Sequence, residues 1–225
     1  MTPVPAASVI LVRDSPTDLE VLMVARPSSG TFPGLTVFPG GRVDGIDALV
    51  RASIRNLPND DHRPFVAAAL RELAEEVGVF LTETPLPEPP LGYRGLRLHQ
   101  AVLDQGGRFE AARLRYVSNW ITPPGAPYRF DTRFYLATVD LTTSVKVAGE
   151  ELLEAFWVSP KAALEQAGIG KRAMIIPTLA HLELLAAHAD VAGLLKSVDR
   201  LPRLPPMRPR SAQDLAMVKV LVEAL

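Results

Sequence analysis

The sequence predicts an α/β fold, because strand-like and helix-like segments alternate along one chain of 225 residues. Two runs rich in aliphatic and β-branched residues, 7–12 and 19–25, indicate paired strands near the N-terminus. A helical segment that begins with the strongly apolar residues 65–70 follows in the first half of the chain. Two further β runs, at 133–139 and 155–158, precede segments with helical character in the second half.

The N-terminal strands are separated by turn-forming residues at 16–18, which predict a tight connection between them. A short strand at 36–38 leads into the turn Pro39-Gly40-Gly41. Glycines allow the backbone to approach a ligand closely, because no Cβ atom intervenes. This turn is therefore a candidate binding element, although an ordinary tight turn would use the same residues.

The main helix has recognisable start and stop signals. Asp60 or Asp61 is expected to be its N-cap, with Pro64 in the first turn. Gly78 is expected to end it, since glycine readily adopts the left-handed conformation of a helix C-terminus. A short helix is expected before it, at 48–54.

The second half of the chain is predicted to hold shorter elements. Four prolines within 82–90 predict a loop. The elements expected after it are helical or irregular segments at 96–103 and 109–115, strands at 133–139 and 155–158, and helices at 160–166 and 178–189.

The C-terminal region is predicted to be an appendage, residues 199–225, on a domain of residues 1–198. Segment 201–210 holds four prolines and reads as an extended linker. Segment 212–225 has apolar residues at helical spacing and reads as a last helix. That helix is expected to dock on its own domain or on a second copy of the chain, which makes a homodimer one expectation.

Composition excludes several classes of function. The 24 basic and 25 acidic residues nearly balance, so no basic surface for nucleic acid is expected. The absence of cysteine excludes disulfides, thiolate catalysis and cysteine-based zinc sites. Neither a long apolar run nor a signal peptide is evident, so we expect a cytoplasmic protein without membrane partners.

Three carboxylates, Glu72, Glu75 and Glu76, follow the apolar part of the main helix at spacings of three and four residues. Such spacing places them on one helix face, where like charges repel. A hard cation removes that repulsion, and Mg²⁺ is usually held by a few carboxylates together with substrate phosphates. A solvated acidic face is the simpler alternative; the strongly apolar start of the helix and the upstream glycine turn favour a metal site.

Gly41 and the segment RELAEEVGV at 71–79 resemble the Nudix box, G-x5-E-x7-R-E-U-x-E-E-x-G-U, where U is apolar. The second half matches at every fixed position. The first half departs from it, because 29 residues separate Gly41 from Arg71 and the box has 13, an insertion of about 16 placed within 42–59. Counting back from Arg71 puts Arg63 where the box has its first glutamate. Either that acid is absent, or another acid replaces it in space; the candidates are Asp44, Asp47, Asp60 and Asp61.

The interruption itself resembles a Nudix branch that includes peroxisomal coenzyme A diphosphatases. The segments similar to that branch are FPG at 32–34, VFPGG at 37–41 followed by Asp44, WITP at 120–123, and RFDTRF at 129–134. The pattern ExxExxWVSP at 151–160 is similar to Nudix proteins in general.

The resemblance implies an α/β/α sandwich around a mixed sheet, with extra C-terminal helices. It also implies a Mg²⁺ or Mn²⁺ site, with Glu75 and Glu76 as the first choice of ligands, and Glu72 and the Gly40 carbonyl beside them. Arg71 would orient a box glutamate.

A general base is expected in the acidic segment before Trp157, at Glu150, Glu151 or Glu154, with Glu151 preferred. The catalytic candidates are thus Glu75, Arg71 and Glu151, and the candidates for substrate contact are Arg26, Phe38, Gly41 and Arg129.

Three functions remain open at this point. The first is metal-dependent hydrolysis of a nucleoside diphosphate linked to another moiety, with coenzyme A or an acyl derivative preferred. The second is the same chemistry on ADP-ribose, NADH or a nucleoside triphosphate. The third is a nucleotide-binding module that has lost catalysis, which the departure in the first half of the box favours and the three intact glutamates oppose.

Overall fold

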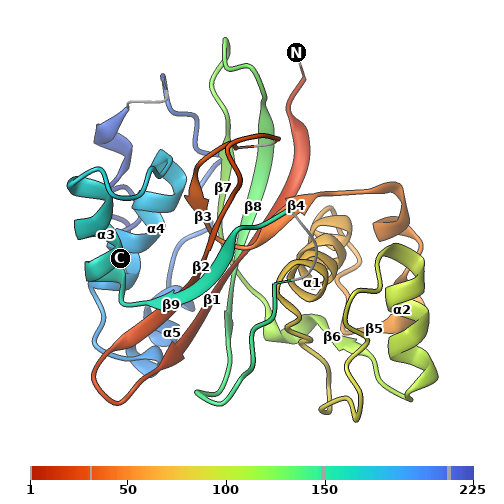
Figure 1. The fold of residues 1–225 in the computed structure, drawn as a ribbon. Helices are drawn as coiled ribbons and strands as arrows, with labels where there is room; N and C mark the ends of the chain where they lie inside the picture. The colour runs from red at the N-terminus through yellow and green to blue at the C-terminus, as the bar shows by residue number, and fades with distance from the viewer. Residues whose placement is uncertain (1, 31, 148–150, 212–213) are drawn as a thin grey trace.

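A mixed sheet of seven strands forms the centre of the molecule (Figure 1). The computed structural model describes residues 2–30, 32–147, 151–211 and 214–225. The strands are β1 (Val4–Asp14), β2 (Leu19–Ala25), β3 (Thr36–Val37), β4 (Gly40–Arg42), β7 (Arg115–Ile121), β8 (Phe130–Thr138) and β9 (Glu154–Val158). Their order is β3-β2-β1-β8-β7, with β4 paired to β1 and β9 paired to β2. The β1–β8 pair is parallel and the other pairs are antiparallel, so the sheet is mixed as expected.

Strands β1 and β2 diverge, and the glycine turn lies where they separate. The pair is in register only from Val12 opposite Val21 to the connecting turn. Further along, β4 takes the place of β2 beside β1, with Ser8 opposite Gly40. The Pro39 carbonyl in this turn accepts hydrogen bonds from the backbone N–H of Val9 and the side chain of Ser8. The sheet therefore holds the glycine turn rigidly at a split between two strands.

Helices cover both faces of the sheet (Figure 1). Helices α1 (Arg63–Val77) and α2 (Gly95–Asp104) lie on one side, and α3 (Pro160–Gly168), α4 (Ile176–Ala186) and α5 (Val191–Val198) lie on the other. Alternate residues of β1 therefore enter different apolar clusters: Val9 and Leu11 pack with α1, and Ile10 and Val12 pack with α4 and α5. Burial of both faces explains the unbroken apolar run at 9–12, and the α/β/α sandwich is confirmed.

Several predicted boundaries are confirmed. Strand β2 covers the predicted residues, and Gly78 ends α1 with a φ of +67°. Helix α2 falls on the predicted segment 96–103. The predicted cap of α1 is wrong: His62 takes the N-cap position, and Asp60 instead accepts a hydrogen bond from the His62 backbone N–H.

The insertion before α1 differs from the short helix expected at 48–54. It forms two 3₁₀ turns, η1 (Gly45–Ala48) and η2 (Arg51–Ser53), followed by strand β5 (Ile54–Arg55). Strand β5 pairs in parallel with β6 (Phe109–Glu110), and the 3₁₀ turn η3 (Ala111–Arg113) follows β6. The conformation of this region therefore depends on strands that are distant in sequence. Strand β7 and helix α5 were not predicted.

The C-terminal segment packs on its own domain. Met207 exchanges two backbone hydrogen bonds with β7, donating to Asn119 and accepting from Ile121, each 2.8 Å long. Met207 and Leu221 are both buried in the cluster beneath α4. A last helix was predicted at 212–225, and residues 212–213 lie outside the described part of the chain. The residues after them form a 3₁₀ turn, η4 (Leu215–Met217), and further turns in place of a regular helix. Of the helices that the structure describes, none is long and apolar enough to cross a membrane.

Candidate active site

A buried arginine organises the acidic face of α1. The side chain of Arg71 is only 3% exposed, and its Nε and Nη2 atoms donate to both oxygens of Asp47, at 2.9 and 3.0 Å. Its Nη1 atom donates to Glu72 at 2.8 Å and to Glu75 at 3.4 Å. Nη2 also donates to the carbonyl of Arg42, at 2.9 Å. One guanidinium therefore ties α1 to strand β4 and to the insertion.

Asp47 replaces the first acid of the Nudix box. It is fully buried, it sits six residues after Gly41, and its Oδ2 atom accepts from the backbone N–H of Asp44 at 2.7 Å. Counting forward from Gly41 would have found it, since the box spacing G-x5-acid is intact and the extra residues follow Asp47. The acid is thus present, and Arg63 lies elsewhere, bonded to Asn59 and to the Pro58 carbonyl.

A second set of contacts, made by Glu76, joins α1 to the glycine turn. One oxygen of Glu76 accepts from the backbone N–H of Gly40 at 2.9 Å, and the other accepts from Nη2 of Arg26 at 2.9 Å. The same Nη2 atom donates to the Gly40 carbonyl, also at 2.9 Å. The guanidinium thus bridges two oxygen donors that the sequence analysis assigned to a metal ion. The Nε atom of Arg26 is buried and has no hydrogen-bond partner in the described part of the chain.

The absence of a side chain at Gly41 leaves the space that the Glu72 carboxylate occupies. A Cβ atom on Gly41 would lie 2.4 Å from the carboxylate carbon of Glu72, so no larger residue fits without displacing that side chain. Gly40 is constrained as well, because its φ of +154° and a Cβ contact of 2.3 Å with the Ala7 carbonyl both exclude a side chain. The two glycines therefore bring the backbone against the acidic face of α1.

Several of the residues described above line a cleft of about 340 Å³. Its polar lining consists of Ser8, Arg26, Gly40, Gly41, Arg42, Asp44, Glu72, Glu76, Glu151, Thr132 and Thr178. Glu75 is not part of this lining; its Oε1 atom accepts from the backbone N–H of Gly95, the first residue of α2, at 2.7 Å. In this structure Glu72 and Glu76 are therefore the box glutamates that face the cleft.

Without a bound cation, burial makes the charged forms of the clustered carboxylates energetically unfavourable. Burial, together with the neighbouring Glu76 carboxylate, raises the pKa of Glu72 to about 7 despite the opposing effect of Arg71. Burial likewise raises the pKa of Glu76. A low-dielectric site disfavours charged carboxylates unless an opposite charge is close. The cluster therefore has the electrostatic character of a cation site.

The donor set fits a hard divalent cation. The oxygens of Glu72, Glu76 and the Gly40 carbonyl are the ligand type that Mg²⁺ and Mn²⁺ prefer. The Arg26 guanidinium already occupies a cationic position between two of them, Glu76 and the Gly40 carbonyl. Among the residues that the structure describes, no three acidic or imidazole side chains are yet arranged to hold an ion. Each of these carboxylates instead accepts hydrogen bonds from the protein, so an ion would have to displace Arg26.

The candidate bases differ in their placement. Glu151 lines the cleft, its side chain is 56% exposed, and it pairs with Arg94 at 3.3 Å. Glu154 pairs with Arg172 at 2.7 Å and is not part of the lining. Glu150 lies outside the described residues. Of the two described candidates, only Glu151 has access to the cleft.

The candidate substrate residues are placed unevenly. Arg26, Phe38 and Gly41 all line the cleft. The structure does not bring Arg129 there: its Nε atom donates to the Thr122 carbonyl at 3.1 Å. Sequence reasoning missed Ser8 and Thr178, for which no local motif gives a signal, since their position depends on how β1 and α4 pack.

Two histidines, His99 and His181, are buried away from the cleft. His181 is fully buried, and its Nε2 atom lies 2.7 Å from the Ser118 hydroxyl. His99 is 3% exposed, and its Nδ1 atom lies 2.8 Å from the Ser53 hydroxyl. Neither lines the cleft.

A mixed sheet between two helical layers, with an acidic helix facing a glycine turn, defines the class of fold and site. The NUDIX domain profile matches residues 2–178, which is most of the chain, and the protein belongs to the Nudix hydrolase family.

A Caenorhabditis elegans protein with the provisional name nudix hydrolase 7 is 33% identical over 193 residues, or 82% of this chain. The match covers 61% of that relative, so the chain spans about three fifths of its length. The crystal structure of a NUDIX hydrolase from Alicyclobacillus acidocaldarius is similar with a TM-score of 0.76 and 28% identity. That match covers 91% of this chain and 99% of the other.

Proposed function

We propose that this protein is a divalent-metal-dependent diphosphohydrolase that cleaves a nucleoside diphosphate linked to another moiety. One observation carries the proposal: Glu76 and the Gly40 carbonyl hold a cationic group, the Arg26 guanidinium, in a cleft that Glu72 also lines. Membership of the Nudix family supports the reaction class.

In this proposal Glu72, Glu76 and Gly40 hold Mg²⁺ or Mn²⁺, and Glu75 joins them if it gives up its bond to Gly95. When bound, the cation neutralises charge that develops on the diphosphate and makes the attacking water more acidic. Arg71 fixes the carboxylates, because Asp47 holds its guanidinium from the other side.

Two cleft residues would act on the reactants themselves. Arg26, displaced from Glu76 by the cation, would contact a phosphate oxygen of the substrate, for which its donor geometry is well suited. Glu151 would accept a proton from water, since it reaches the cleft and the carboxylate of Glu154 is held by Arg172.

Coenzyme A or an acyl derivative is the preferred substrate, on the basis of the interrupted box and the segments around it. ADP-ribose, NADH and nucleoside triphosphates are the alternatives that share the chemistry. We expect a small-molecule substrate and no nucleic-acid partner, because the charges of the chain nearly balance.

Product analysis tests this proposal. The purified chain would be incubated with Mg²⁺ or Mn²⁺ and coenzyme A, acetyl-coenzyme A, ADP-ribose, NADH and nucleoside triphosphates. Cleavage of coenzyme A to 3′,5′-ADP and phosphopantetheine would support the preferred substrate. Cleavage of another compound would keep the reaction and replace the substrate, and Glu76→Gln serves as the inactive control.

A binding module without catalysis is the second candidate. One observation favours it: the described carboxylates are already engaged by protein donors, above all Arg26 on Glu76. Calorimetry separates the two candidates. Nucleotide binding that needs no divalent cation, together with no turnover of any compound, would favour the binding module.

A further inference from the structure

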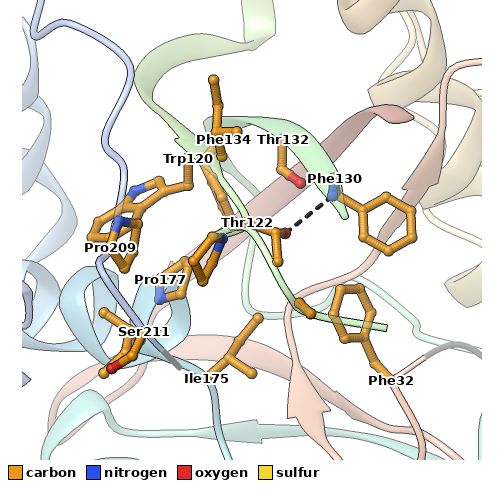
Figure 2. Close-up of a pocket in the computed structure, with 14 residues that line it drawn as sticks. Phe32, Trp120, Thr122, Phe130, Thr132, Phe134, Ile175, Pro177, Pro209 and Ser211 are labelled. Atoms are coloured by element: carbon orange, nitrogen blue, oxygen red, sulfur yellow. Dashed lines mark hydrogen bonds between the residues drawn. The ribbon is translucent and has the colours of Figure 1, made fainter. Parts of the chain in front are cut away.

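A second cavity, of about 120 Å³, adjoins the proposed active site. Five residues line both spaces, namely Phe32, Phe130, Thr132, Phe134 and Ile175. Figure 2 shows the rings of Phe32 and Phe130 at one side of this cavity and Trp120 and Pro209 at the other. A molecule held at the carboxylates can therefore extend into it without leaving the protein.

The lining of this cavity is almost entirely apolar. Of its 14 residues, eleven are aliphatic, aromatic or proline, and the others are Thr122, Thr132 and Ser211. The Thr122 hydroxyl oxygen already accepts from the backbone N–H of Phe130, at 3.0 Å (Figure 2). The indole N–H of Trp120 donates to the Ser118 hydroxyl at 3.1 Å. The Thr122 hydroxyl oxygen and the Trp120 N–H are therefore already engaged within the protein.

The apolar lining determines which chemical groups bind favourably in this cavity. A nucleobase or a sugar brings several donors and acceptors, and most of them would lose their water without finding a partner in a lining with three hydroxyl side chains. An aliphatic group loses nothing of that kind and gains from leaving water. The cavity therefore favours an aliphatic group over the polar ends of the substrate.

The wall shared with the active site is held in an unusual conformation. Phe32 has a φ of +58°, which residues other than glycine seldom adopt. Its ring lies 5.1 Å from that of Phe130, tilted by 38°. Backbone strain of this kind persists where the surroundings hold it, often at ligand sites. Here it places an aromatic ring between the charged cleft and the apolar cavity.

We propose that this cavity is the subsite for an aliphatic group that the substrate carries close to its diphosphate. The inference rests on the proposed function and narrows its substrate class. An apolar cavity of about 150 Å³ accommodates benzene, so a space of about 120 Å³ suits roughly four or five carbons. The branched, dimethyl-substituted arm that coenzyme A carries next to its diphosphate meets this description, and the hydroxylated ribose of ADP-ribose does not.

A homologous series of substrates tests the subsite. The compounds are P2-alkyl esters of ADP bearing methyl, ethyl, propyl, butyl or octyl groups, together with a trihydroxybutyl ester matched in length to butyl. Each buried methylene contributes a factor of about four to kcat/KM. We expect a rise of at least tenfold from methyl to butyl, little further gain at octyl, and a trihydroxybutyl ester at least tenfold poorer than butyl.

Filling the cavity provides the matched variant. Ala126 lines it, so Ala126→Phe is expected to bring the butyl-to-methyl ratio of kcat/KM close to one. Ala189→Phe, at an exposed position outside the lining, is expected to keep the wild-type ratio. Binding of the non-hydrolysable methylene analogues of the same esters should follow the same order.

The outcomes separate the two proposals. A rate that does not depend on chain length, or a trihydroxybutyl ester as good as butyl, would overturn the subsite and leave diphosphate hydrolysis standing. A butyl preference that survives Ala126→Phe unchanged would also overturn it. No hydrolysis of any ester, of coenzyme A or of ADP-ribose would instead overturn the proposed function itself.

Discussion

Replacing Asp47 by asparagine tests whether this residue is the buried partner of the site arginine. The substitution keeps the shape of the side chain and removes the charge that accepts two bonds from Arg71 and one from the backbone N–H of Asp44. Removing one partner of a buried ion pair typically costs about 3–5 kcal/mol. Glu72 and Glu75 still contact Arg71, so we expect the lower end, about 3 kcal/mol.

The other acids considered for the same role supply the control. Asp61 pairs with Arg133 at 2.7 Å, but its side chain is 66% exposed. Exposed pairs contribute at most about 1 kcal/mol, so Asp61→Asn should change little. The free energy of unfolding would be measured by urea denaturation in EDTA at pH 7.5 for both variants. A loss below about 1 kcal/mol for Asp47→Asn, or equal losses for both variants, would refute the assignment.

Three further predictions concern the glycine turn, the general base and a buried histidine. Gly41→Ala should weaken Mn²⁺ binding at least about tenfold in calorimetry with little change in far-UV circular dichroism, because the added Cβ displaces the Glu72 carboxylate; unchanged affinity would contradict the placement of Glu72. Glu151→Gln should lower kcat by about 10²-fold or more, whereas Glu154→Gln, whose partner is Arg172, should stay near wild type; equal effects would remove Glu151 as the base. Burial lowers the pKa of His181 in the folded protein to about 3. As the pH falls, this histidine is therefore protonated in the unfolded chain before it is protonated in the folded one, and the free energy of unfolding decreases below about pH 6.5. Between pH 7.5 and 5 the wild type should lose about 2 kcal/mol more than His181→Gln, and parallel urea-denaturation profiles would show that the histidine does not titrate as inferred.

The sequence predicted the elements whose signals are local. The run 9–12 is apolar throughout because helices cover both faces of β1, and Gly78 was recognisable because only glycine ends a helix easily at a φ of +67°. The three glutamates and Arg71 were identified from helical spacing together with the family motif. All four lie on α1, where spacing along one helix fixes which side chains are neighbours.

The elements that the sequence missed depend on distant partners. Strand β7 contains Ser118 and Asn119, two buried polar residues that break the apolar pattern; the Ser118 hydroxyl bonds to His181, and the Asn119 amide N–H donates to Asp131. The end of the chain resembles a helix in its spacing, but it forms short turns that pack on the cluster beneath α4. Asp47 was one of four candidate acids because the insertion broke the spacing counted back from Arg71. The spacing counted forward from Gly41 singles it out, and the fold shows it bonded to the guanidinium.

The most direct test of the central claim is Mn²⁺ binding measured beside turnover, in wild type and in Glu76→Gln. Glu76 lines the cleft and bonds to Gly40 and Arg26, so it should be required for both. We expect wild type to bind Mn²⁺ and to hydrolyse at least one compound of the diphosphate panel only when the cation is present, and Glu76→Gln to lose both properties while remaining folded. Hydrolysis that persists in EDTA, or a Glu76→Gln variant that binds Mn²⁺ and turns over like wild type, would contradict it.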